Sequence, residues 1–215
     1  LPLHGLINYF QDCSTFQSEE LGIGVEYLKE KGRLWVLTSW QIRIFRYPSL
    51  GEAVRTGTWA CGFHGFVGMR NFVMETAEGE MLACAYSEWA YMDPAAGRPV
   101  RADAGEVQRY GMEEPLEMEY AGRKISVPGE QRFLDPVTVH AHHLDSNHHV
   151  NNGQYVAIAA EYLPEGFQVR QLRAEYKRQA RLGDILTPGI SESSGAYVVT
   201  LNDQAGRPYV ILEFS

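Results

Sequence analysis

The pattern of apolar and polar residues changes along the chain from a helical spacing to a strand spacing. Residues 6–20 place apolar side chains on a broad face of a predicted helix, and a further turn or two is predicted over residues 25–31. Runs rich in Trp, Val, Thr, Ile and Phe then alternate with turn residues, as strands do, over residues 35–45, 54–63, 67–75 and 81–92. One helix followed by several antiparallel strands predicts an α+β fold in which a sheet wraps around the helix.

This pattern is interrupted over residues 103–132, where Gly, Pro and charged residues are frequent and one short helix is predicted at residues 105–110. A connection of this length is unusual inside one compact domain. We therefore predict an N-terminal domain over residues 1–102, a connector over residues 103–132 and a C-terminal domain over residues 133–215.

The order of elements repeats in the C-terminal half. The strands predicted there span residues 133–143, 169–181, 185–191, 196–201 and 209–214. The turns at residues 51–52 and 77–80 recur at residues 183–184 and 204–207, about 130 residues later in each case, which indicates a diverged internal duplication. The strand before the second helix has no counterpart in the first half, so we expect the N-terminal copy to lack its first strand.

A polar segment in the second copy carries a carboxylate, an amide and an imidazole at alternate positions: Asp145, Asn147 and His149. If the backbone is extended there, these three side chains point to one side. The first copy has no such set, and we predict that it is non-catalytic.

An apolar helix follows this segment directly. Residues 156–160 are apolar on every face, which predicts a helix that is buried all round. Asn151 or Asn152 can cap its start, and Pro164 ends it. The free N–H groups and partial positive charge of a helix N-terminus suit a carbonyl oxygen that becomes an oxyanion, so the segment is a sensible place to hydrolyse an ester or thioester.

The run Asp-x-Asn-x-His-Val-Asn-Asn, followed by Tyr155, resembles the signature of the acyl-[acyl-carrier-protein] thioesterases of plants and bacteria. Other stretches resemble the same family in the same order: residues 33–38, 47–52, 58–59, 68–71 and 175–178. The resemblance implies two fused hotdog domains with the catalytic motif in the second. It also implies hydrolysis of acyl-carrier-protein thioesters to free fatty acids, without a metal or another cofactor.

The resemblance assigns roles that the spacing alone leaves open. Asp145 would attack the thioester or act as a base, Asn147 would orient the carboxylate or a water, and His149 would move a proton near neutral pH. The alternative is that Asp145 and Asn147 shape a loop and His149 is a packed histidine. Spacing alone favours this alternative, and the resemblance favours catalysis.

Gln179 is a departure from the family pattern. Family members commonly carry Glu at this position, where it is implicated in activating water, and plant members carry Cys where this chain has Ala180. Because Gln cannot accept a proton, either Asp145 supplies the base and Gln179 orients water, or the site turns over slowly.

Charge limits the partners that can be expected. With 19 Lys and Arg against 27 Asp and Glu, the net charge is −8, which argues against nonspecific binding to nucleic acid. Basic residues nevertheless gather between residues 170 and 181. Of these, Arg173, Lys177 and Arg178 are predicted to bind the carrier protein or its pantetheine arm, although a solvated strand face explains the cluster equally well.

Other features exclude some function classes and leave others open. Five of the seven histidines lie between residues 140 and 149, but no accompanying ligand pattern favours a metal site, and we predict none. Three cysteines without a C-x-x-C spacing indicate a reduced, cytoplasmic protein, and no apolar run is long enough for a membrane span.

The function classes that remain are related. Rivals to the acyl-carrier-protein thioesterase are an acyl-CoA thioesterase of the same fold and a non-catalytic acyl-binding protein, which Gln179 makes more credible. A hotdog dehydratase is less favoured, because no His paired with a helix carboxylate has the usual sequence context. A homodimer is one assembly that the sequence leaves open.

Overall fold

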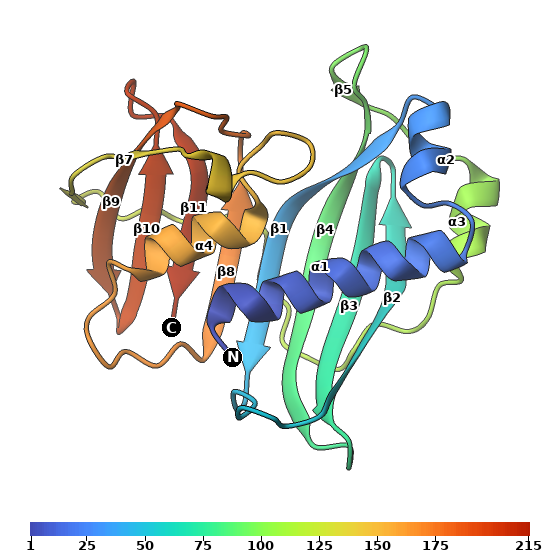
Figure 1. Ribbon diagram of the computed structural model, residues 1–215, viewed down its shortest axis with the longest axis horizontal. Helices are drawn as coiled ribbons and strands as arrows, with labels where there is room; N and C mark the ends of the chain where they lie inside the picture. The colour runs from blue at the N-terminus through green and yellow to red at the C-terminus, as the bar shows by residue number, and fades with distance from the viewer. The chain divides into compact units, whose positions relative to one another are not determined.

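The computed structural model describes residues 1–215 and divides into two compact units (Figure 1). The first unit comprises Leu1 and residues 8–121, and the second comprises residues 2–7 and 122–215. Each unit contains an antiparallel sheet and one principal helix, which confirms the predicted α+β class. No helix of the protein is both long enough and apolar enough to span a membrane.

The first unit is built on four long strands in the order β2-β3-β4-β1. All neighbouring pairs are antiparallel, and the short strand β5 (Arg98–Pro99) extends β4 at one end. The long strands are β1 (Leu34–Ile44), β2 (Val54–His64), β3 (Val67–Thr76) and β4 (Met81–Asp93). These bounds lie within one or two residues of the predicted strands, because β-branched and aromatic residues with clear turn signals leave little ambiguity in this half.

Helix α1 (Leu3–Glu20) packs against one face of this sheet through the residues that belong to the first unit. The ring of Phe10 lies 6.1 Å from that of Trp40 on β1 and 5.3 Å from that of Phe72 on β3, and all three side chains are buried. Two shorter helices complete the unit, α2 (Val25–Glu30) and α3 (Ala104–Tyr110). The core of the first unit therefore lies between α1 and the sheet.

The first part of the predicted connector is packed onto the first unit. Gln41 follows the buried Trp40, and Asn71 precedes the buried Phe72. Since neighbouring residues of a strand point to opposite faces, Gln41 and Asn71 point to the face of the sheet away from α1. Asn71 Oδ1 accepts hydrogen bonds from the Leu116 N–H (3.1 Å) and the Tyr120 hydroxyl (3.2 Å), and Gln41 Oε1 accepts one from the Ala121 N–H (2.8 Å). Residues 116–121 thus cover the face of the sheet that α1 leaves open.

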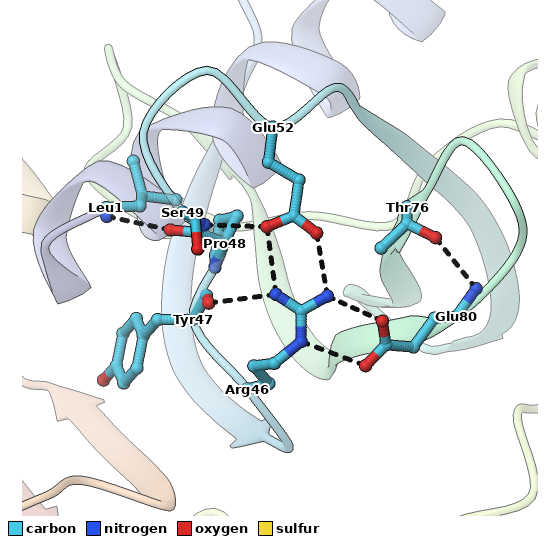
Figure 2. Close-up of polar contacts among 8 residues, drawn as sticks. All are labelled: Leu1, Arg46, Tyr47, Pro48, Ser49, Glu52, Thr76 and Glu80. Carbon is cyan, nitrogen blue, oxygen red and sulfur yellow. Dashed lines mark hydrogen bonds and ion pairs between the residues drawn. The ribbon is translucent and has the colours of Figure 1, made fainter.

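The turn between β1 and β2 is held by one guanidinium group (Figure 2). Arg46 Nη1 and Nη2 donate to both carboxylate oxygens of Glu52 at 2.9 and 2.8 Å, while Nε and Nη2 donate to Glu80 at 3.0 and 2.6 Å. Glu52 also accepts a hydrogen bond from the Ser49 N–H at 2.7 Å. These bonds hold the pKa of Glu52 down to about 2, chiefly through Arg46.

The second unit contains six strands, five in the order β8-β11-β10-β9-β6 and a sixth, β7, paired to β9. They are β6 (Arg132–Phe133), β7 (Val137–Thr138), β8 (Gln171–Tyr176), β9 (Ile185–Ser193), β10 (Ala196–Asn202) and β11 (Pro208–Phe214). Helix α4 (Asn152–Ala160) packs on β10 and β11. Val156 and Ala159 are fully buried, whereas Gln154, Ala157 and Ala160 are half-buried. The predicted apolar helix is therefore present, but it is not buried all round.

Two predicted strands of the second unit are wrong in extent. The predicted strand over residues 133–143 is two two-residue strands and a 3-10 turn, η1 (Ala141–His143). Pro136 has no N–H to donate and interrupts the ladder. The predicted strand over residues 169–181 ends at Tyr176, because the N–H groups of Lys177 and Arg178 both turn to the Tyr209 carbonyl, at 2.8 and 3.2 Å.

Candidate active site

The motif segment is a tight hairpin, so the extended backbone considered for residues 145–149 does not form. Leu144 and Val150 form an antiparallel bridge, the Asp145 N–H donates to the His149 carbonyl at 2.8 Å, and the His148 N–H donates to the Asp145 carbonyl at 3.1 Å. His148 closes the turn with a φ of 61°, the left-handed position of a three-residue hairpin loop. The hairpin places Asp145 opposite His149 at a Cβ separation of about 5 Å.

The Asp145 carboxylate shapes this hairpin with one of its two oxygens. Oδ1 accepts the N–H groups of Asn147 at 2.8 Å and of His149 at 3.2 Å. Oδ2 has no partner within the protein, and the same holds for the side chains of Asn147 and His149. Asn147 is exposed at the tip and His149 is half-buried. Asp145 is therefore a loop-forming residue that keeps one oxygen available for chemistry.

The start of α4 follows the hairpin immediately and is capped by Asn151. Its side chain Oδ1 accepts the Gly153 N–H at 2.8 Å, and its carbonyl accepts the Gln154 N–H at 2.9 Å. The Asn151 N–H itself donates to the His143 carbonyl at 2.9 Å. Of the two predicted caps, Asn151 is the one used. Because the Gly153 and Gln154 N–H groups are occupied, these two cannot form the predicted oxyanion site as the structure stands.

Gln179 lies on a segment that is bonded directly to the motif. The carbonyl of Ala180 accepts the Val150 N–H at 2.9 Å, and the N–H of Ala180 donates to the Tyr155 hydroxyl at 2.7 Å. Val150 ends the hairpin and Tyr155 stands in the first turn of α4. These two bonds hold the backbone next to the exposed Gln179 against the end of the hairpin that carries Asp145, Asn147 and His149.

Comparisons with known proteins identify the family of this chain. Residues 1–109 match the model of the acyl-ACP thioesterase N-terminal domain, and residues 127–209 match that of the acyl-ACP thioesterase C-terminal domain. The chain belongs to the acyl-ACP thioesterase family. The family resemblance seen in the sequence is therefore confirmed.

Similar proteins of the family include plant enzymes. A chloroplastic acyl-[acyl-carrier-protein] hydrolase of Cuphea viscosissima is 27% identical over 198 residues, which cover 84% of this chain and 48% of the relative. The chloroplastic oleoyl-acyl carrier protein thioesterase 1 of Arabidopsis thaliana is 25% identical over 216 residues, covering 88% of this chain and 59% of the relative. The chain thus spans about half the length of the curated relatives it matches.

Solved structures of the same family establish the fold. An acyl-ACP thioesterase from Bacteroides thetaiotaomicron has a TM-score of 0.90 at 22% identity, with 100% of this chain and 89% of that chain covered. The 12:0-ACP thioesterase from Umbellularia californica has a TM-score of 0.85 at 19% identity, with 99% and 88% covered. The predicted hotdog fold is confirmed by this likeness.

Glu175 is the carboxylate nearest along the chain on the Gln179 side of β8, and both of its oxygens are already bonded. Its side chain is buried, with Oε2 accepting the Ile125 N–H at 3.1 Å and Oε1 accepting the Lys177 ammonium at 2.5 Å. Glu175 thereby ties the last part of the connector to β8. It does not replace the missing carboxylate of the family pattern.

The three basic residues predicted to bind substrate all have partners within the second unit. Arg173 donates to Glu213 at 2.8 Å and to the carbonyls of Gly122 and Lys124 at 2.7 and 3.1 Å. Arg178 lies 3.1 Å from the Asp203 carboxylate and stacks over the Tyr209 ring at 4.5 Å. The Lys177 ammonium likewise donates to the Glu175 carboxylate, at 2.5 Å.

Three histidines gather just before the hairpin. The rings of His142 and His143 are 4.0 Å apart, and His140 lies 5.8 Å from His142 and 6.0 Å from His143. His143 is buried, and its Nδ1 accepts the His140 N–H at 3.0 Å. Burial lowers the pKa of His143, as do the neighbouring His142 and His140. No group of three or more His, Cys, Asp or Glu side chains in the protein has the arrangement of a metal site.

Sequence reasoning missed the bonds that two tyrosines make around the start of α4. Tyr155 bonds to Ala180 as described, and the Tyr176 hydroxyl donates to the Asn152 carbonyl at 3.1 Å. Their rings lie 6.1 Å apart. Tyr155 belongs to the family signature, but only its bonding partner, 25 residues away along the chain, indicates what it does.

Proposed function

We propose that this protein hydrolyses the thioester of an acyl-[acyl-carrier-protein] and releases a free fatty acid. Membership of the family supports the reaction class. The observation that carries the proposal is the pair of bonds from Ala180 to Val150 and Tyr155, which sets Gln179 beside the hairpin of Asp145 and His149. We infer that the carboxylate, the imidazole and the two amides act together on a water and a thioester bound at this hairpin.

In the proposed reaction Asp145 Oδ2 takes a proton from water while the water oxygen bonds to the thioester carbon. The carbon–sulfur bond then breaks and the acid is released. The departing pantetheine sulfur takes up a proton from His149, which recovers it from Asp145, so both groups return to their starting states. Asn147 and Gln179 orient the water through their amides. A direct attack by Asp145 Oδ2 on the carbonyl is an equivalent use of the same carboxylate, followed by hydrolysis of the acyl-enzyme.

We propose that Arg173, Lys177 and Arg178 contribute the positive charge that an acidic carrier protein would meet. All three cations are already paired, but the side chains of Lys177 and Arg178 are 37% and 36% exposed, against 16% for Arg173. Lys177 and Arg178 would therefore meet the carrier protein directly, and Arg173 would act through its fixed position. We further propose that the N-terminal domain (residues 1–102), the connector (103–132) and the catalytic domain (133–215) are the functional divisions of the chain.

The three cysteines are free, which supports a reducing compartment, and we propose the cytoplasm. A homodimer is the assembly that we propose to test first, by sedimentation of the purified protein.

Gln179 favours one alternative function, an acyl-binding protein without turnover. A hydrolysis panel decides between the two. Acyl-carrier-protein and acyl-CoA substrates of varied chain length would be compared under the same conditions, with release of the free thiol as the readout. We expect turnover that is faster with the carrier substrate. Faster turnover of acyl-CoA would make CoA the natural donor, and acyl binding without turnover would support the non-catalytic alternative.

A further inference from the structure

We propose that Tyr155 is a positioning residue, whose phenol oxygen holds the Gln179 segment in register with the motif hairpin. This inference rests on the proposed function and extends it to a residue that contacts no substrate. The observation behind it is a hydrogen bond that the Ala180 N–H donates to the Tyr155 hydroxyl at 2.7 Å.

The backbone around Ala180 cannot be held by the sheet. The ladder of β8 ends at Tyr176, and the Lys177 and Arg178 N–H groups share the Tyr209 carbonyl. Beyond that point the chain leaves β11, yet Ala180 is fully buried. A buried N–H requires a partner, and a side chain supplies it here in place of a strand.

Both bonds of Ala180 lead to the motif, from two sides. Its carbonyl is fixed to Val150 at the end of the hairpin, and its N–H is fixed to Tyr155 in the first turn of α4. A single bond would leave the segment free to rotate about it. The two bonds fix the two peptide planes on either side of the Ala180 Cα atom. The plane held by Tyr155 is the one that joins Gln179 to Ala180, so this bond limits the direction in which the Gln179 side chain leaves the backbone.

Tyr155 is itself held firmly. Its side chain is 2% exposed, and burial raises the pKa of its phenol, so the hydroxyl stays neutral. The neighbouring Tyr176 lies 6.1 Å away, ring to ring, and donates to the Asn152 carbonyl at the same end of α4. Tyr176 is therefore a matched control, since it has the same chemistry in the same place but no bond to Ala180.

The test compares Tyr155→Phe with Tyr176→Phe in the full chain. Each change removes one buried hydroxyl and keeps the ring. We expect Tyr155→Phe to lower kcat about tenfold with KM nearly unchanged, as loss of orientation does, and Tyr176→Phe to keep kcat within about twofold at a similar Tm. In a Gln179→Ala background, Tyr155→Phe should have no further effect on kcat.

Hydrogen exchange supplies a readout that does not depend on catalysis. The Ala180 amide should exchange at least about tenfold faster in Tyr155→Phe, with Gly153, bonded to the Asn151 cap, unchanged. Equal kcat values for the two Phe variants, or an undiminished effect in the Gln179→Ala background, would overturn the inference. A wild-type protein without turnover would refute the proposed function, and slow Ala180 exchange in Tyr155→Phe would then separately refute the bond's role.

Discussion

Replacing Asp145 by Asn separates the structural role of its carboxylate from its chemical role. The hairpin uses Oδ1 as the acceptor of two N–H groups, from Asn147 and His149. An Asn side chain still offers one carbonyl oxygen in the same position, so Asp145→Asn should keep the turn. It removes the group that takes up a proton or attacks the thioester.

The structure allows the two effects to be sized. A hydrogen bond to a charged acceptor contributes about 1.5–3 kcal/mol and one to a neutral acceptor about 0.5–1.5 kcal/mol. Because both bonds of Asp145 are partly exposed, Asp145→Asn should cost about 1 kcal/mol and Asp145→Ala, which loses both bonds, about 2–3 kcal/mol. For a chain of this size each kcal/mol lowers Tm by about 2–4 °C. Loss of a general base or nucleophile should lower kcat by about 100-fold or more.

The assay is thermal unfolding and acyl-carrier-protein hydrolysis on the same preparations of the wild type and both variants. We expect the two variants to lose activity to a similar extent but to differ in Tm, with Asp145→Asn closer to the wild type. Near-normal turnover in Asp145→Asn would refute the catalytic assignment and leave Asp145 as a loop residue. Equal Tm values for Asn and Ala would instead refute the role given to Oδ1.

Three further outcomes follow from individual side chains. Gln179→Ala should lower kcat about tenfold, whereas Gln179→Glu should fold normally and gain little or no rate if Asp145 is the base; an unchanged rate in Gln179→Ala would remove this position from the site. Lys177→Glu should raise KM for an acyl-carrier-protein substrate more than for a short pantetheine thioester, and equal effects on both would mean a merely solvated charge. The pKa of Glu52 is about 2 in the folded protein, below its usual value, so its bonds to Arg46 stabilise the fold above about pH 4.5 and this stabilisation is lost as pH falls toward 2. The Tm difference between wild type and Glu52→Gln should therefore shrink over that window, and a difference independent of pH would contradict the linkage.

Local pattern was sufficient to predict the α+β class and to select the candidate site residues. The strands of the first unit and the buried helix α4 follow from periodicity, because each is a long run whose apolar spacing matches only one kind of element. The cap at Asn151 follows from the preference of its side chain for helix starts. The family motif is one contiguous run, so it identified Asp145, Asn147 and His149 as candidate residues without any information from the tertiary structure.

The geometry of the site depended on partners that are distant along the chain. The alternate spacing of Asp145, Asn147 and His149 was considered for an extended backbone, but a hairpin with a left-handed His148 forms instead. The Asp145 carboxylate can accept the two N–H groups only when the chain turns back. The basic residues read as a free cluster, yet Arg173 is bonded to Glu213 and to two carbonyls of the connector.

The role of Tyr155 shows most directly what the sequence alone could not predict. Its hydroxyl bonds to an amide 25 residues away, and nothing in the intervening sequence signals that pairing. A side-chain pattern predicts which face is apolar, because burial depends on the residue itself. A hydrogen bond between distant segments depends on where the chain leaves its strand, and only the folded backbone determines that.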